Sequence, residues 1–236
     1  NGVSVTNASG TLLLTPAGTA GQLQGKVALT IPDVNFSGTF AIGINTTAAP
    51  VNETFTVGDE TMTLDLSVGP YLRVEGTDIS LTIAGQTLTG NVAFEQTTKT
   101  DGSTLVTVAL SDVTLSLGAA DQPIVSLTNG QGLFVVAPTG LAGRLAGTIE
   151  VAVPGDAFEF TGSFGVEINT TNQPVDQDFL VGGEVINLTM DRSNAIRVIG
   201  TNVTLSVAGQ TLMADFAFEQ ITDTNGVKSI RVAVAN

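Results

Sequence analysis

The sequence predicts an all-β protein: two tandem antiparallel β-rich repeats forming an elongated sandwich or solenoid-like stack, with no significant helix. Three observations lead to this prediction. Apolar and polar residues alternate along most of the chain, as they do in half-buried strands. Thr, Val, Ile and Phe, which suit a pleated surface, fill the alternating segments. Long pieces of the sequence also occur twice.

The repeat covers nearly the whole chain. TNASGTLLLTPAG (residues 6–18) returns as TNGQGLFVVAPTG (128–140), and GINTTAAPVNETFTVG (43–58) returns as EINTTNQPVDQDFLVG (167–182). The copies keep one alignment up to an insertion near Gly155 and another after it. We therefore predict one β repeat over residues 1–122 and a second over 123–236, which lacks the counterpart of 113–122. This frame leads us to expect a piece of a longer array.

The alternation defines the strands in order. TMTLDLSV from Thr61 places its Met, Leu and Val side chains on one face, and ISLTIAG from Ile79 does the same with Ile and Leu. Reading every alternating segment in this way predicts about ten short strands in each copy. Phe residues occupy matching core positions in the two copies: Phe36/Phe160, Phe40/Phe164, Phe55/Phe179 and Phe94/Phe218.

Turn residues separate the predicted strands. Small-residue and Asx-Gly pairs suit the positive-φ positions of tight hairpin turns; they are Ala84-Gly85, Ala208-Gly209, Asp101-Gly102 and Asn225-Gly226. The prolines fit strand ends, where a missing N–H donor costs no ladder hydrogen bond: Pro16, Pro32, Pro50, Pro138, Pro154 and Pro174. An antiparallel meander is therefore expected.

Composition excludes several classes of function. The chain has 22 acidic and 8 basic residues, a formal net charge of −14, and no His, Cys or Trp. It therefore lacks the ligands and nucleophile partners of zinc-finger, haem-His, iron–sulfur, Ser-His-Asp and Cys-His sites. The negative charge disfavours nucleic acids and anionic membranes, and no apolar run is long enough to cross a bilayer. We expect a non-enzymatic acidic protein.

The remaining acid–base groups are carboxylates. Glu60/Glu184 and Glu95/Glu219 recur in both copies and could in principle serve a glycosidase mechanism. A chain with one Tyr and no Trp has little to stack a sugar, so the structural interpretation is favoured. Basic residues recur only at Arg73/Arg197, which predicts the structural pairs Arg73 with Glu95 and Arg197 with Glu219.

Calcium is the cofactor that the sequence leaves open. DTNG, with Asp223 and Asn225, resembles the start of an oxygen-rich calcium loop, but the first copy has KTDG from Lys99 in its place. A hairpin turn explains both copies, whereas calcium explains one. Asp176 and Asp178 in NQPVDQD are an equal alternative. The metal candidates are thus Asp223, Asn225, Asp176 and Asp178.

N-x-S/T triplets are frequent, and glycosylation at them is a minority interpretation. They begin at Asn7, Asn35, Asn45, Asn52, Asn169, Asn187 and Asn202. For Asn45 and Asn169, which open the shared INTT motif, we predict side-chain turn bonds at a strand end.

The shared motifs INTT, AGQTL and AFEQ resemble the tandem repeats of very large secreted or surface-exposed bacterial proteins of the adhesin and extracellular-filament type. This resemblance implies an extracellular or cell-surface location, copies in series and a mechanical role. Low charge content, many Thr and Gly residues and acidity also favour such a location. We expect a structural repeat unit of a fibre or giant surface protein that joins copies of itself end to end through strand edges, without nucleic acid or membrane insertion. The alternative is a calcium-assisted adhesin or carbohydrate-binding module.

Overall fold

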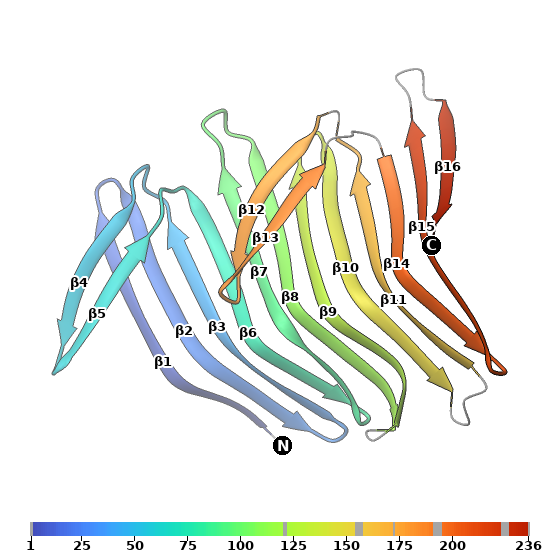
Figure 1. Cartoon of the computed structure of the whole chain (residues 1–236). Coiled ribbons are helices and arrows are strands. Elements are labelled where there is room, and N and C mark those ends of the chain that lie inside the picture. Colours follow the sequence, from blue (N-terminus) through green and yellow to red (C-terminus); the bar gives the residue numbers. More distant parts are fainter. Residues whose placement is uncertain are drawn as a thin grey trace.

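The computed structural model describes residues 2–119, 122–153, 158–171, 173–190, 195–222 and 227–235. These residues form sixteen strands and no helix, so the all-β prediction is confirmed. Twelve strands make one open antiparallel sheet in the order β1-β2-β3-β6-β7-β8-β9-β10-β11-β14-β15-β16, and two hairpins, β4–β5 and β12–β13, form separate two-stranded sheets (Figure 1).

The strands of each copy correspond. In the first copy they are β1 (Gly2–Thr15), β2 (Gly18–Ile31), β3 (Val34–Asn45), β4 (Val51–Val57), β5 (Glu60–Leu66), β6 (Tyr71–Ile83), β7 (Gln86–Thr98) and β8 (Thr104–Ala119). In the second they are β9 (Gln122–Ala137), β10 (Gly140–Val153), β11 (Phe158–Asn169), β12 (Val175–Val181), β13 (Glu184–Met190), β14 (Ala195–Val207), β15 (Gln210–Thr222) and β16 (Lys228–Ala235). The sheet runs unbroken across the repeat boundary, because β8 pairs with β9.

Each copy has fewer and longer strands than the sequence predicted, because several Asx residues form bulges inside strands instead of ending them. The pairing register shifts at these residues, and an extra residue with positive φ bends a strand. They are Asn7, Asp78, Asp112, Asn129 and Asn202, with φ between 51° and 53°. The bulges accompany the bend that the long strands show in Figure 1.

The turn predictions agree with the structure where it describes them. Ala84 (φ 49°) and Gly85 (φ 81°) make the two-residue turn between β6 and β7, and Ala208-Gly209 repeats it between β14 and β15. Asp101-Gly102 lies in the loop from β7 to β8, while Asn225-Gly226 is outside the described residues. Of the six prolines named from the sequence, five flank strands as expected, and Pro154 is outside the described residues.

Both hairpins lie over the same face of the sheet, and a buried asparagine fixes each crossover. Asn45 ends β3 and is fully buried. Its Nδ2 donates to the carbonyls of Ala49 and Ser67 at 2.9 and 2.8 Å, and its Oδ1 accepts from the N–H and hydroxyl of Thr47 at 2.9 and 2.8 Å. The turn role predicted for the INTT motif is confirmed, and Asn169 has the same arrangement with Thr171.

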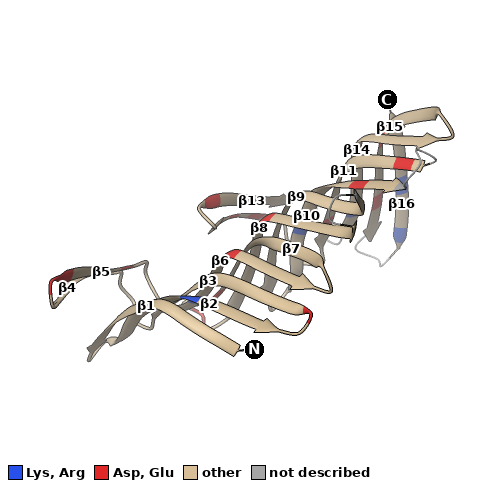
Figure 2. Ribbon diagram, turned by 90° about the horizontal axis from the view of Figure 1, so that it is seen from below, with Lys and Arg blue, Asp and Glu red and all other residues tan. Residues whose placement is uncertain are grey.

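The opposite face of the sheet is apolar and is not covered by any described residue. One row of directly opposed side chains crosses six strands as Leu23, Ile42, Val74, Phe94, Val108 and Phe134. Leu23 and Ile42 are 55% and 40% exposed. Charged residues are sparse over the ribbon, as Figure 2 shows. The layered core is therefore confined to the regions beneath the hairpins.

Candidate functional site

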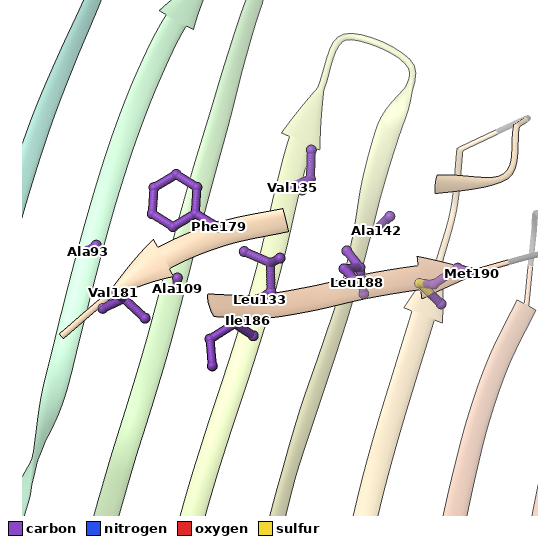
Figure 3. Packing of buried hydrophobic residues seen from close by; sticks show 10 residues of the cluster. All are labelled: Ala93, Ala109, Leu133, Val135, Ala142, Phe179, Val181, Ile186, Leu188 and Met190. Atoms are coloured by element: carbon purple, nitrogen blue, oxygen red, sulfur yellow. The ribbon is translucent and has the colours of Figure 1, made fainter. Parts of the chain in front are cut away.

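The larger of the two buried apolar clusters in the described residues is the contact between hairpin β12–β13 and strands β7 to β10, which we call the inner joint (Figure 3). It consists of Ala93, Ala109, Leu133, Val135, Ala142, Phe179, Val181, Ile186, Leu188 and Met190, all less than one-tenth exposed. Alternation along the hairpin strands brings their large side chains to the inner side. The hairpin belongs to the second copy, whereas β7 and β8 belong to the first, so the inner joint ties the copies together.

Small residues on the sheet make room for the hairpin. Ala93, Ala109 and Ala142 are completely buried under larger side chains, including Val181 and Leu188, which are also completely buried. This alternation of small and large residues permits close packing. In the sequence these alanines look like ordinary strand residues, because their packing role depends on a hairpin that is distant in the chain.

Polar contacts hold the tip of hairpin β12–β13. The guanidinium of Arg73 lies 4.8 Å from the ring centroid of Phe179 and donates to the carbonyl of Leu180. The N–H of Gly182 donates to Oε1 of Glu75 at 2.8 Å, and the Ser111 hydroxyl donates to the Val181 carbonyl at 3.4 Å. The tip is therefore bound by residues of two sheet strands, β6 and β8.

The predicted pair Arg73 and Glu95 lies directly across β6 and β7, with Nη1 and Oε2 separated by 3.4 Å. A second carboxylate, Glu75, approaches Arg73 Nη2 to 3.0 Å. The two carboxylates orient the guanidinium toward the hairpin. Sequence reasoning missed Glu75 because the second copy has Ile199 in its place.

The other predicted pair belongs to a ladder of alternating charge over five strands. Arg144, Glu167, Arg197, Glu219 and Arg231 are directly opposed in this order on β10, β11, β14, β15 and β16. Arg197 faces Glu219 in the register, and its Nη1 lies 3.7 Å from Glu167 Oε2. Arg144 lies 3.8 Å from Glu167, and Arg231 lies 3.7 Å from Glu219. The strand register assembles this ladder, which no local motif announces.

A groove of about 500 Å³ runs over the ladder beside the end of hairpin β12–β13. Its lining comprises Glu167, Thr189, Met190, Ala195, Arg197, Ala217, Glu219, Arg231, Val232 and Ala233. By the alignment of the copies, Arg197, Ala217 and Ala233 correspond to Arg73, Ala93 and Ala109 of the inner joint. The groove therefore contains sheet residues equivalent to those beneath hairpin β12–β13, but no described hairpin packs on them.

Hairpin β4–β5 is the opposite case, because its tip has no sheet residues packed beneath it among the described residues. Its proximal half packs on its own copy through Val51, Leu64 and Leu66 over Ala20, whereas its distal half extends past the edge strand β1 (Figure 1). Val57 at the distal end is 65% exposed, although its counterpart Val181 is 0% exposed. This hairpin therefore presents an apolar tip without a floor among the described residues.

The metal candidates do not form a cluster where the structure describes them. Asp176 and Asp178 lie on the outward face of β12, where Asp176 accepts from the Thr189 hydroxyl at 3.1 Å and Asp178 accepts from Asn187 Nδ2 at 2.8 Å. Asp223 and Asn225 lie outside the described residues. Within the described ranges, no group of three acidic side chains could hold an ion.

The recurring carboxylates occupy two unlike places. Glu60 and Glu184 begin the second strands of the two hairpins and are exposed. Glu95 and Glu219 lie on the sheet beside arginines. The geometry therefore favours a structural role for Glu95 and Glu219, which lie beside arginine side chains.

Comparison with protein-family models, curated proteins and solved structures found no match to this chain. Among the described residues, no helix has the length and apolar character needed to cross a membrane.

Proposed function

We propose that this chain is a non-enzymatic structural unit of an extracellular or cell-surface fibre, and that copies join end to end by pairing strand β16 of one with strand β1 of the next. The observation that carries the proposal is the internal β8–β9 pairing. Strand β16 is the counterpart of β8, and β1 is the counterpart of β9. Both lie at opposite edges of the sheet with one described neighbour each.

The internal pairing also supplies the register. Val108 lies opposite Phe134, and their counterparts are Val232 and Leu12. Leu12 is 60% exposed and Val232 is 68% exposed, so both are accessible in a single chain. Unpaired edge strands of this length are ready templates for another strand. Pairing them would continue the same sheet from copy to copy.

Cross-linking tests this joint directly, because the chain has no Cys. We expect the double variant Leu12→Cys with Val232→Cys to give a ladder of covalent multimers on oxidation, since directly opposed side chains lie about 5 Å apart. Val3→Cys with Val232→Cys is the matched control, because Val3 is 70% exposed but lies at the far end of β1. Equal ladders from both variants would contradict the register, and a wild-type chain that stays monomeric in sedimentation at high concentration would contradict the proposal.

The extracellular location rests on composition and can be tested separately. Low charge content, abundant Gly and Thr and a net charge of −14 support it. Antibodies against the chain should label intact source cells. Labelling only after permeabilisation would contradict an extracellular location.

A further inference from the structure

The two hairpins differ in what lies beneath their tips. Phe55 and Val57 correspond to Phe179 and Val181, which fill the inner joint. Val57 is nevertheless 65% exposed, and a Cβ added to Gly58 at the tip would meet no atom within 4 Å. A Cβ at the corresponding Gly182 would come within 2.4 Å of the Asn91 amide. One tip is docked and the other is free.

Residues equivalent to those beneath the docked tip are present at the opposite end of the same chain. Ala217 and Ala233 are more exposed than their fully buried counterparts Ala93 and Ala109. Arg197 has a 46% exposed side chain, whereas Arg73, which covers Phe179, is 22% exposed. The groove over these residues has room for an apolar tip.

We propose that the free tip of hairpin β4–β5 is a clasp that docks into the β14–β16 groove of a second copy of this chain. The proposal rests on the end-to-end pairing proposed above, which brings the tip of one copy over the groove of its neighbour. Val57 then packs on Ala217 and Ala233. The Arg197 guanidinium then covers Phe55 and donates to the Thr56 carbonyl, as Arg73 covers Phe179 and donates to the Leu180 carbonyl.

Docking of the clasp allows only one pairing register between the edge strands of two copies. A pair of edge strands can slip by two residues and keep every side chain on its own face, because the side-chain period is two. The hairpin is anchored to its own copy by Leu64 and Leu66. Its tip therefore reaches Ala217 and Ala233 in one alignment only, and slipped pairings lose this contact.

The joint between copies has fewer polar contacts than the inner joint. Glu75 and Ser111, which bind the docked tip, correspond to Ile199 and Ala235. Neither side chain can accept from the tip N–H or donate to its carbonyl. We therefore expect copies to separate from each other under conditions in which hairpin β12–β13 remains docked.

Substitution at the tip tests the clasp. Val57→Asp should leave the fold of the single chain intact, because Val57 is exposed, and should weaken association by about tenfold or more, since docking would bury an unpaired charge. Val185→Asp is the matched control: it makes the same change at a Val that is 66% exposed on the hairpin already docked. Association is measured by sedimentation velocity, and folding by circular dichroism.

Cross-linking separates the clasp from edge pairing. Val57→Cys with Ala233→Cys should give multimers with a short bis-maleimide, whereas Val57→Cys with Val185→Cys should not. If Leu12→Cys with Val232→Cys forms a ladder while the Val57–Ala233 pair does not, and Val57→Asp associates like Val185→Asp, the clasp is wrong and edge pairing stands. If the wild-type chain does not associate at all, both proposals are overturned.

Discussion

At the scale of single residues, short polar side chains shape this protein in two ways. Asn45 and Asn169 are fully buried; Asn45 ties the two legs of its hairpin crossover together, and Asn169 donates to the Gln173 carbonyl on the entering leg of its own. Other Asx residues, such as Asp78 and Asn202, adopt positive φ and bulge the strands. A neighbouring strand supports these two bulges: the N–H of Asp78 donates to Asn91 Oδ1 at 3.0 Å, and that of Asn202 donates to Asp215 Oδ1 at 2.7 Å. The same residue types thus act as crossover anchors and as strand bends.

Removing a buried anchor should destabilise the fold. Asn45→Ala leaves the carbonyl of Ser67 and the N–H of Thr47 without the partner that Asn45 provides, so we expect a loss of about 1–3 kcal/mol in the free energy of unfolding. Asn35→Ala, at an exposed Asn that also begins an N-x-S/T triplet, should change it by less than about 0.5 kcal/mol. Urea unfolding of both variants measures the difference, and equal costs would contradict the anchor role.

Tyr71 should ionise above its ordinary range. Burial is the main cause that raises the pKa of its phenol, and the nearby carboxylate of Glu95 adds to it. The folded state therefore retains the phenol proton longer than the unfolded state. This contribution to stability is complete below the unfolded pKa of about 10 and is lost as pH rises through the folded value.

Alkaline absorbance titration checks this prediction, because Tyr71 is the only Tyr. The native chain should titrate at higher pH than the chain in concentrated denaturant. Glu95→Gln should lower the pKa partway, since burial, the larger cause, remains. Coincident native and denatured curves would refute the prediction.

At the scale of elements, the two hairpins are one motif in two environments. Gly58 and Gly182 have nearly equal φ values of 62° and 58°. Only Gly182 contacts the sheet, through Asn91, whose side chain also donates to Ser111 and Asp112 at 3.1 Å. The backbone requirement is therefore shared, and the packing requirement belongs to the docked hairpin alone.

This pair allows a matched test. Gly58→Ala should cost about 1–2 kcal/mol for a left-handed Ala, whereas Gly182→Ala should cost about 1–3 kcal/mol more, because displacing Asn91 breaks hydrogen bonds at its amide. Thermal or urea unfolding of single chains at low concentration gives both values. If Gly58→Ala were as costly as Gly182→Ala, the two tips would have equivalent surroundings, contrary to the structure.

At the scale of the whole molecule, the sheet has two unequal faces and two open edges. One face carries the hairpins and the charge ladder, and the other is an apolar surface that no described residue covers. The chain also carries a net charge of −14, so copies that approach end to end repel one another. Association must therefore overcome a long-range repulsion before short-range apolar contacts form.

Salt should strengthen association for this reason. The screening length falls from about 10 Å at 0.1 M salt to about 3 Å at 1 M, so sedimentation should show larger species as NaCl is raised. Weaker association at high salt would mean instead that ion pairs between copies dominate the joint.

Much of the fold could be predicted from local patterns. Strand content follows from alternation, which a segment such as residues 61–68 displays by itself. The Ala-Gly turns and the Asn45 and Asn169 anchors follow from side chains that act on neighbouring backbone. The number of strands was wrong, because an Asx residue in an alternating segment can either end the strand or bulge it, and the partner strand decides between these outcomes.

The sequence by itself therefore determined the all-β class, the two copies and the turns, because each depends on contacts within a few residues or on direct similarity. The tertiary structure alone decided which surfaces are covered. Val57 and Val181 occupy equivalent positions in their copies, but Val57 is exposed whereas Val181 is completely buried in the inner joint with Ala93 and Ala109. Burial is a property of residues brought together from distant parts of the chain, and equal local sequence does not ensure equal neighbours.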